Sequence, residues 1–221
     1  MNTTNTMKHL AIIADGNRRW ARANDLPVKT GYIQGLITIE NCCDWAIKNN
    51  IEYLTVFCFS TENWNRPKEE VDLLMDLARW YFDYQREWYI SRGIRVKFAG
   101  RRDRFDQDFR DIITRMEQDT ATGQYLTITI CIDYGGRSEI ARAVYCGART
   151  EEEIAAFVSR GLPDPDAILR TGGEYRLSNF LLWQSAYSEL LFTKTYFPDL
   201  NDTVLNELLD EYHSRKRNYG K

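Results

Sequence analysis

The chain has 221 residues, of which 43% are hydrophobic and 13% aromatic, which is enough for one globular domain with a substantial apolar core. Its formal net charge of −3 excludes a broadly basic surface, so we expect no nucleic-acid partner. No run reaches the roughly 20 apolar residues that a membrane span requires.

Residues 1–7 are polar and lack the apolar segment of a signal peptide, so we expect a flexible N-terminus followed by one domain over 8–221. The chain has five cysteines, an odd number, and no C-x-x-C pair. This pattern favours reduced thiols over disulfides or a zinc site. We therefore expect a cytoplasmic protein, and this expectation leaves peripheral contact with a membrane surface open.

Strand and helix patterns alternate along the chain. Strands are predicted over 9–13, 53–59, 94–98, 126–132 and 167–169, with a sixth candidate over 189–192. Helices are predicted over 31–48, 68–91, 103–118, 138–146, 151–160 and 201–217. This order predicts an α/β fold, a single domain with a mostly parallel sheet covered by helices on both faces.

The helix predicted over 68–91 is apolar over more than one stripe, with residues such as Leu74, Trp80, Tyr81, Phe82 and Tyr84. One part of it should face the core, and the rest should face another apolar partner. A neighbouring helix and the wall of an apolar tunnel explain this pattern equally well.

The first polar motif, D-G-N-R-R-W, follows the strand predicted over 9–13. It consists of Asp15, Gly16, Asn17, Arg18, Arg19 and Trp20. The carboxylate can hold Mg²⁺ against phosphates, glycine allows close approach to the backbone, and N–H groups at a helix start bind anions. An ordinary turn with solvated arginines is equally compatible with this motif alone.

The second polar motif follows the strand predicted over 53–59 and ends before Pro67, which suits a helix start. Its polar and aromatic members are Ser60, Thr61, Glu62, Asn63, Trp64 and Arg66. Such a mixture is unusual in an ordinary loop, although a capping loop with a buried Trp64 remains the alternative.

The third motif places two glycines between two arginines and a serine after the strand predicted over 167–169. Its candidate binding residues are Arg170, Arg176, Leu177 and Ser178. Arginines beside glycines predict a second anion cradle, with a glycine turn as the alternative. The Walker and dinucleotide-binding glycine patterns are absent, so neither nucleotide function is indicated.

Glu189 lies in an apolar stretch, where an isolated carboxylate is costly and needs a metal or an arginine as partner. A structural ion pair is the more common outcome. The only histidines are His9 and His213, which leaves little for a Ser-His-Asp site. Two anion cradles and abundant apolar wall suit a substrate with a diphosphate head and a hydrocarbon tail.

The ordered motifs D-G-N-R-R-W, F-S-T-E-N-W-N-R-P, Y-G-G-R and R-T-G-G-E-Y-R-L-S-N-F-L-L-W-Q resemble the cis-prenyltransferase family, and within it the bacterial undecaprenyl diphosphate synthases. The resemblance covers residues 8–220. It implies a parallel sheet of about six strands, an apolar tunnel beneath the active site, a homodimer, and Mg²⁺-dependent condensation of isopentenyl diphosphate onto an allylic diphosphate.

The resemblance also assigns roles. Asp15 is the essential acid and, with Glu189, lies at the metal, while Asn63 helps to remove the proton. Gly16, Asn17, Arg18 and Arg19 cradle the allylic diphosphate, with Trp20 as a further candidate contact. Ser60, Thr61, Glu62, Trp64 and Arg66 order the loop around isopentenyl diphosphate, whose diphosphate binds Arg170, Arg176, Leu177 and Ser178.

Three residues beside the allylic site depart from the family pattern. Ala14 replaces a methionine, Tyr32 replaces a histidine, and Val28 replaces an arginine for which Lys29 is a candidate substitute. Tyrosine can bind a phosphate, but it does not exchange protons near neutral pH.

We expect farnesyl diphosphate as starter and a medium-long product of about C50–C55, since Cys58 is small and near the expected tunnel, with Leu126 as its floor. A short-chain or branching synthase that uses dimethylallyl or geranyl diphosphate is the first alternative. A non-catalytic partner subunit is a second, disfavoured by the persistence of Asp15, Asn63 and Glu189.

Overall fold

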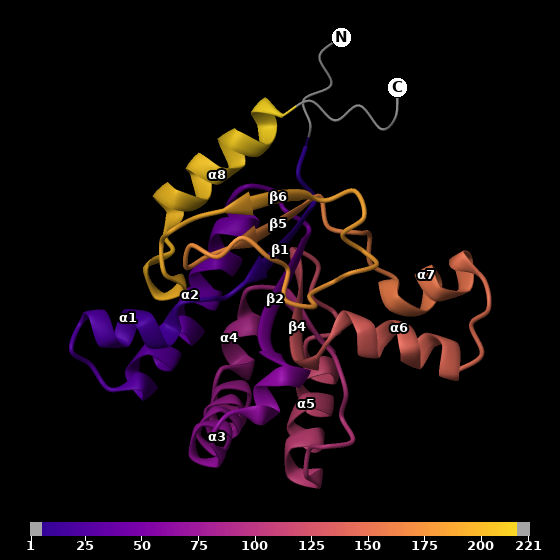
Figure 1. Ribbon diagram of the computed structural model, residues 1–221, viewed down its shortest axis with the longest axis horizontal. Coiled ribbons are helices and arrows are strands. Elements are labelled where there is room, and N and C mark those ends of the chain that lie inside the picture. Colours follow the sequence, from indigo (N-terminus) through magenta and orange to yellow (C-terminus); the bar gives the residue numbers. More distant parts are fainter. Residues whose placement is uncertain (1–5, 216–221) are drawn as a thin grey trace.

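The computed structural model describes residues 6–215, which contain a six-stranded, all-parallel β-sheet (Figure 1). The strands are β1 (His9–Ile13), β2 (Tyr53–Ser60), β3 (Ile94–Ala99), β4 (Leu126–Tyr134), β5 (Ala167–Arg170) and β6 (Glu189–Phe192). Their order across the sheet is β3-β4-β2-β1-β5-β6. The predicted single-domain α/β fold is confirmed, and every predicted strand forms.

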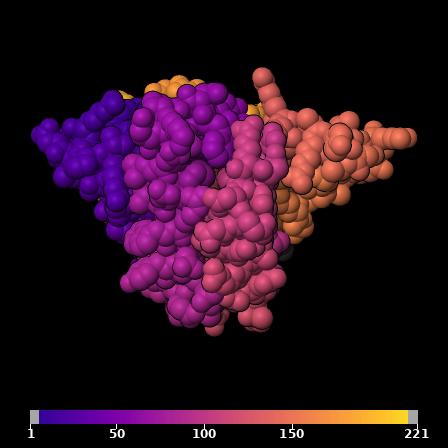
Figure 2. Space-filling model, turned by 90° about the horizontal axis from the view of Figure 1, so that it is seen from below, coloured from indigo at the N-terminus to yellow at the C-terminus, as the bar shows by residue number. Residues whose placement is uncertain are grey.

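Helices and short 3-10 turns connect the strands. They are α1 (Asn17–Ala23), α2 (Val28–Lys48), η1 (Thr61–Asn65), α3 (Lys68–Tyr84), α4 (Arg86–Ser91), α5 (Gln107–Asp119), α6 (Gly136–Tyr145), α7 (Glu151–Ser159), η2 (Phe197–Asp199) and α8 (Asp202–Ser214). Figure 1 and Figure 2 show α6 and α7 projecting at one side of the sheet. No helix within 6–215 combines the length and apolar character needed to cross a bilayer.

The two faces of the sheet are covered unequally. Side chains alternate along each strand, so Leu10 and Ile12 of β1 face one side and Ala11 and Ile13 face the other. The first side packs against α2 to α5 and α8 in the larger core. The second side packs mainly against Phe180 and its neighbours, in the irregular chain that follows β5.

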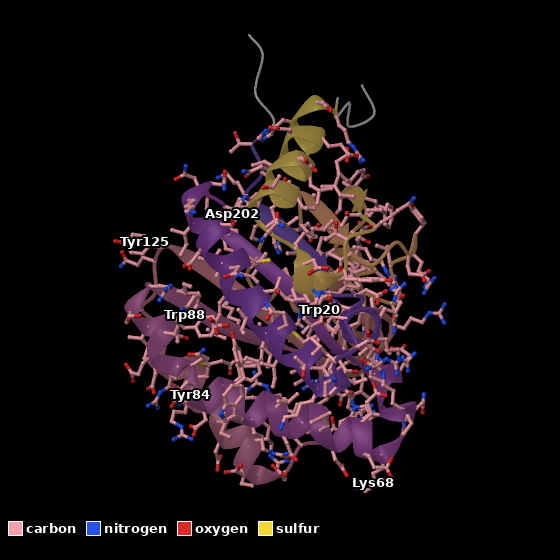
Figure 3. All side chains as sticks on the ribbon, turned by 90° about the vertical axis from the view of Figure 1, so that its left-hand side faces the viewer. Trp20, Lys68, Tyr84, Trp88, Tyr125 and Asp202 are labelled. Atoms are coloured by element: carbon pink, nitrogen blue, oxygen red, sulfur yellow. The ribbon has the colours of Figure 1, made fainter. Side chains whose placement is uncertain are left out.

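The predicted helix over 68–91 is wrong in one respect, because the structure divides it into α3 and α4. Gln85 lies between them with φ −87° and ψ 4°, which interrupts the helical ladder, and its amide donates to Glu40 at 2.8 Å. Trp80 and Tyr84 stack on each other and are 50% and 72% exposed, so these two residues do not form the wall of a tunnel. Figure 3 shows Tyr84 near the edge of the molecule.

The chain ends differ from expectation where they are described. Met7 is buried in the larger core, although it falls in the segment predicted to be flexible. Residues 1–5 of that segment lie outside the described residues. The last helix ends at Ser214, and positions 216 and 217 of the predicted helix lie outside the described part as well.

The carboxyl ends of the parallel strands form one edge, where loops carry the polar motifs. Near that edge β2 pairs irregularly with β4, with register shifts between Phe57 and Phe59 and again before Ser60. Such bulges redirect the side chains that follow. The start of η1 is therefore turned out of the sheet at the position where the second motif begins.

Candidate active site

The three predicted polar motifs converge above β1, β2 and β5, where they line a pocket of about 330 Å³. The predicted site residues on its walls are Asp15, Gly16, Asn17, Arg18, Arg19, Tyr32, Ser60, Asn63, Arg66, Arg170 and Ser178. Residues far apart in sequence thus meet in one polar cavity at the carboxyl edge of the sheet, as expected for a parallel α/β fold.

Asp15 lies just beyond β1, and an arginine binds each of its carboxylate oxygens. Oδ1 accepts from Arg19 at 3.0 Å and Oδ2 accepts from Arg170 at 2.9 Å. The Thr171 hydroxyl bonds the main chain of Asp15, which fixes the turn. The carboxylate is 29% exposed, so it is open to the pocket while its backbone is held.

Gly16 is required by the geometry of this turn. Its φ is +113°, and an added Cβ would lie 2.7 Å from the Tyr196 ring. The glycine therefore lets the chain turn directly from β1 into α1 beneath Tyr196, which keeps Asp15 and Arg19 on the same side of the pocket.

Two glycines of α2 allow α1 to approach closely. An added Cβ on Gly31 would lie 2.3 Å from the main-chain oxygen of Asn17, and one on Gly35 would lie 2.4 Å from its side-chain Oδ1. Asn17 Nδ2 donates to the carbonyl of Ala14 at 3.3 Å. The Gly-x-x-x-Gly spacing on α2 thus positions Asn17, a role that sequence reasoning missed.

Glu70 of α3, which was not predicted, is the common partner of three predicted residues. It accepts from the Tyr32 hydroxyl at 2.6 Å, from Arg66 at 3.0 Å and from Arg18 at 3.0 Å. Burial opposes ionisation of Glu70, but the Tyr32 hydrogen bond and the charges of Arg66 and Arg18 outweigh it and lower the pKa of Glu70. Burial and the bond to Glu70 raise the pKa of Tyr32, so this phenol stays a neutral donor.

Asn63 and Ser60 lock the start of η1 through reciprocal bonds. The Ser60 N–H donates to Asn63 Oδ1 at 3.1 Å, and the Asn63 N–H donates to the Ser60 hydroxyl. Asn63 therefore lines the pocket in a defined orientation. Its amide oxygen is already engaged, which leaves the NH₂ group for other partners.

Arg170, at the end of β5, organises the third motif. Its guanidinium is buried and donates to Ser178 Oγ at 2.7 Å and to the main-chain oxygen of Arg176 at 2.5 Å, besides Asp15. Ser178 has φ +49° and Gly172 has φ +82°, so the segment curls over this arginine. The predicted cradle is therefore built around Arg170 and Ser178.

Several predicted residues lie outside the pocket lining. Trp20, which is labelled in Figure 3, donates to Asp199 of η2 at 2.6 Å. Lys29 is exposed, and the Arg176 side chain pairs with Glu174. The other predicted residues absent from its walls are Thr61, Glu62, Trp64 and Leu177. Thr61, Glu62 and Trp64 belong to the second motif and Leu177 belongs to the third, but none of the four lines the cavity.

Glu189 does not share a site with Asp15 in this chain, contrary to expectation. Glu189 starts β6 in register with Ala167, three residues before Arg170, whereas Asp15 follows the strand end. Glu189 therefore lies roughly 10 Å along the sheet from the end of β1, beyond which Asp15 follows by two further residues, and two strand spacings, roughly 10 Å, across the sheet from β1. Glu189 instead pairs with Arg215 at 2.8 Å, which is the structural ion pair.

An apolar cavity of about 80 Å³ adjoins the polar pocket. Both cavities are lined by Ala14, Cys58 and Leu74, and the apolar one continues past Leu36 and Phe82. Burial raises the pKa of the Cys58 thiol to about 12, so this side chain is a small neutral part of the wall. Leu126, predicted as the floor, is buried in the core and does not line either cavity.

The donor set at Asp15 is compatible with Mg²⁺. This ion is commonly held by one or two carboxylates together with water and substrate phosphates, so a single accessible carboxylate suffices. Within the described residues, no group of three or more acids, histidines or cysteines is placed to hold a metal by itself. A metal at Asp15 would therefore depend on a phosphorylated substrate for its other ligands.

Comparison with known proteins finds relatives along nearly the whole chain. Residues 13–220 match the family model described as "Putative undecaprenyl diphosphate synthase". An isoprenyl transferase of Aquifex aeolicus is 42% identical, with 97% of this chain and 96% of that protein covered. The "ditrans,polycis-undecaprenyl-diphosphate synthase ((2E,6E)-farnesyl-diphosphate specific)" of Xylella fastidiosa is 40% identical, with coverage of 96% and 89%.

A solved structure shares the fold over nearly the whole chain. The lavandulyl diphosphate synthase of Lavandula x intermedia, in complex with dimethylallyl diphosphate, has a TM-score of 0.92 at 29% identity, and 98% of this chain and 99% of that one are covered.

Proposed function

Because this chain belongs to the undecaprenyl diphosphate synthase family of prenyltransferases, we propose that it condenses isopentenyl diphosphate repeatedly onto farnesyl diphosphate to give a medium-long, undecaprenyl-type product. The observation that carries this proposal is the junction of the two cavities. The arginine-rich pocket adjoins the apolar cavity at Cys58 and Leu74, which line both. A diphosphate head and a growing hydrocarbon tail require this combination.

The proposed chemistry breaks the allylic C–O bond and forms a C–C bond from the double-bond electrons of isopentenyl diphosphate, after which a proton leaves. Negative charge develops on the departing diphosphate, and fixed cations stabilise it. Arg18 and Arg19 would hold this group beside Gly16 and Asn17. Mg²⁺ bound at Asp15 would supply further positive charge there.

The second diphosphate would bind at Arg170 and Ser178. This places isopentenyl diphosphate on the β5 side of the pocket and the allylic substrate on the α1 side, with Asp15 between them. Asn63 lines the same cavity, and its expected part in proton removal would be indirect, since its oxygen accepts from Ser60 and its NH₂ group can only donate, for example to a diphosphate oxygen.

A short-chain or branching synthase remains the second candidate, and specific residues favour it. Ala14 and Tyr32 line both cavities, and Tyr32 is tied to Glu70 and Arg66. The allylic side of the pocket is thus altered where the starter would lie. Similarity in fold to a synthase solved with dimethylallyl diphosphate supports testing that starter as well.

The direct experiment incubates the purified chain with labelled isopentenyl diphosphate, Mg²⁺ and, in parallel, farnesyl, geranyl or dimethylallyl diphosphate. Long labelled polyprenols from farnesyl diphosphate support the main proposal, and their loss with EDTA supports the metal. Short products from the smaller starters would favour the second candidate. No extractable product from any starter would contradict both and favour a non-catalytic subunit.

We further propose a homodimer, which rests on the family resemblance. Light scattering after size exclusion would give twice the chain mass, and a monomer that is fully active would contradict the proposal.

A further inference from the structure

Asp133 is the last but one residue of β4, and both its burial and its backbone conformation are energetically unfavourable. Its side chain is completely buried, and its φ of +47° lies in the left-handed region that few residues other than glycine adopt. Oδ2 is buried and has no hydrogen-bond partner among residues 6–215. A buried, partly satisfied acid and a strained backbone both oppose stability, and such features concentrate at functional positions.

The other oxygen of Asp133 holds the second motif. Oδ1 accepts from the indole Nε1–H of Trp64 at 2.9 Å, and Arg104 lies 3.6 Å from the same oxygen. The Trp64 ring packs edge-on against Phe59 at 5.3 Å and near Phe105 at 6.5 Å, while Arg104 lies 5.7 Å from its centre. The indole is thus fixed at its edge by Asp133 and on its sides by apolar and cationic neighbours.

Trp64 directly follows Asn63 in η1, so the anchor and the pocket residue move together. The other bond that orients Asn63 comes from Ser60, which lies beyond the irregular pairing of β2 with β4. The strand itself is therefore a poor support for η1. The hydrogen bond that Trp64 donates to Asp133 ties the loop to the end of β4.

We propose that Asp133 is a positioning residue that orients Asn63 by anchoring the Trp64 indole. This inference rests on the proposed function, because its consequence for turnover supposes that Asn63 takes part in the condensation. The acid makes no contact with substrate in this role. Its effect passes through one hydrogen bond, and an asparagine oxygen could accept the same bond.

The kinetic test compares Asp133→Ala, Asp133→Asn and Trp64→Phe, the last of which keeps an aromatic ring but removes the indole N–H donor. Asp133→Ala and Trp64→Phe are each expected to lower kcat about 100-fold, the size of effect caused by an ångström of misplacement. Asp133→Asn should stay within about threefold of the wild type. The KM of the allylic diphosphate, whose proposed cradle lies on α1, should change less than about threefold in all of them.

The double variant Asp133→Ala/Trp64→Phe should be no slower than either single variant, because all three lose the same bond. Effects that multiply would overturn the proposal, as would a Trp64→Phe enzyme with unchanged kcat. If Asp133→Ala fails to fold, Trp64→Phe and Asp133→Asn still decide the question. Trp45→Phe is the matched control, since its indole donates to Asn206 at 2.8 Å far from η1; it should leave kcat unchanged.

A spectroscopic readout separates this inference from the proposed function. The indole N–H resonance of Trp64, identified by its loss in Trp64→Phe, should shift and exchange faster with solvent in Asp133→Ala but not in Asp133→Asn. An unchanged resonance in Asp133→Ala would overturn the anchor. A normal NMR result with an inactive wild type would instead contradict the proposed function.

Discussion

At the scale of single residues, the site is a set of carboxylates that already hold the cations a diphosphate would need. Asp15 binds Arg19 and Arg170, and Glu70 binds Arg18 and Arg66. The arginines are thereby oriented before substrate arrives, which reduces the cost of ordering long side chains on binding. The acids have different tasks, since only Asp15 lies between the two proposed diphosphate positions.

Asp15→Ala tests that assignment. We expect turnover to fall at least about 1,000-fold, as when a main electrostatic stabiliser is removed, while the chain still folds with a lower thermal midpoint, because the buried Arg170 guanidinium loses one of its partners. Steady-state kinetics and thermal unfolding measure the two effects. Asp202→Ala, which removes a surface acid paired with Lys48, is the control, and retained activity in Asp15→Ala would refute the metal role.

Cys58→Phe tests the path of the hydrocarbon tail. Cys58 lies where the polar and apolar cavities meet, so a phenyl ring there should block elongation and shorten the products. Chromatographic sizing of the dephosphorylated polyprenols is the measurement. Cys58→Ala should not shorten them, and products of unchanged length from Cys58→Phe would place the tail elsewhere.

At the scale of elements, α1 and α2 meet through glycine, and this contact decides where Asn17 lies. Gly31 and Gly35 of α2 differ in the atoms that an added side chain would meet. Gly31 faces the backbone of Asn17, which cannot yield without moving α1, whereas Gly35 faces the tip of the Asn17 side chain. The contact between α1 and α2 is therefore rigid at Gly31 and adjustable at Gly35.

This difference predicts distinct outcomes for a matched pair of variants. Gly31→Ala should destabilise the protein by about 1–3 kcal/mol, since the helices must separate. Gly35→Ala should change stability by less than about 1 kcal/mol, because Asn17 can rotate, and yet raise the KM of the allylic diphosphate. Thermal unfolding and kinetics distinguish them; equal stability losses in both would contradict the interpretation.

At the scale of the whole molecule, the candidate active site lies over the middle of the sheet, while the larger apolar core lies on one face. The central strands β2, β1 and β5 present the polar edge, and α2 to α5 with α8 bury the larger apolar cluster beneath and beside it. His9 of β1 is buried at the opposite end of its strand. Nδ1 lies 2.7 Å from the Pro163 carbonyl, which only accepts, so the ring donates there and accepts from Thr55 at Nε2.

His9 should make stability depend on pH. Burial lowers the pKa of His9 from 6.5 to about 4, so between these values the unfolded chain binds the proton and the folded one does not. Stability should therefore fall as pH decreases from 6.5 to 4, by about 3 kcal/mol from this group. Urea unfolding of wild type and His9→Gln isolates the effect, with the exposed His213→Gln as control. Parallel pH profiles for wild type and His9→Gln would contradict it.

The sequence by itself determined the fold class, all six strands and the edge of the sheet where the polar motifs meet. Apolar runs in the sequence indicate buried strands without any knowledge of distant contacts. Because the carboxyl ends of parallel strands share one edge of the sheet, the sequence also predicts that Asp15, Ser60 and Arg170 lie close together. The family resemblance supplied the expected substrates, because the same motifs occur in the same order in proteins of that family.

Only the tertiary structure decided which side chains from distant segments pair with the predicted site residues. It put Glu70 among three predicted residues, gave Glu189 to Arg215, and set Asp133 beneath Trp64. It also turned Trp80 and Tyr84 to solvent. The physical reason is that a hydrogen bond or ion pair depends on which helix face meets which loop, and this is settled by packing across the whole chain rather than by the local pattern.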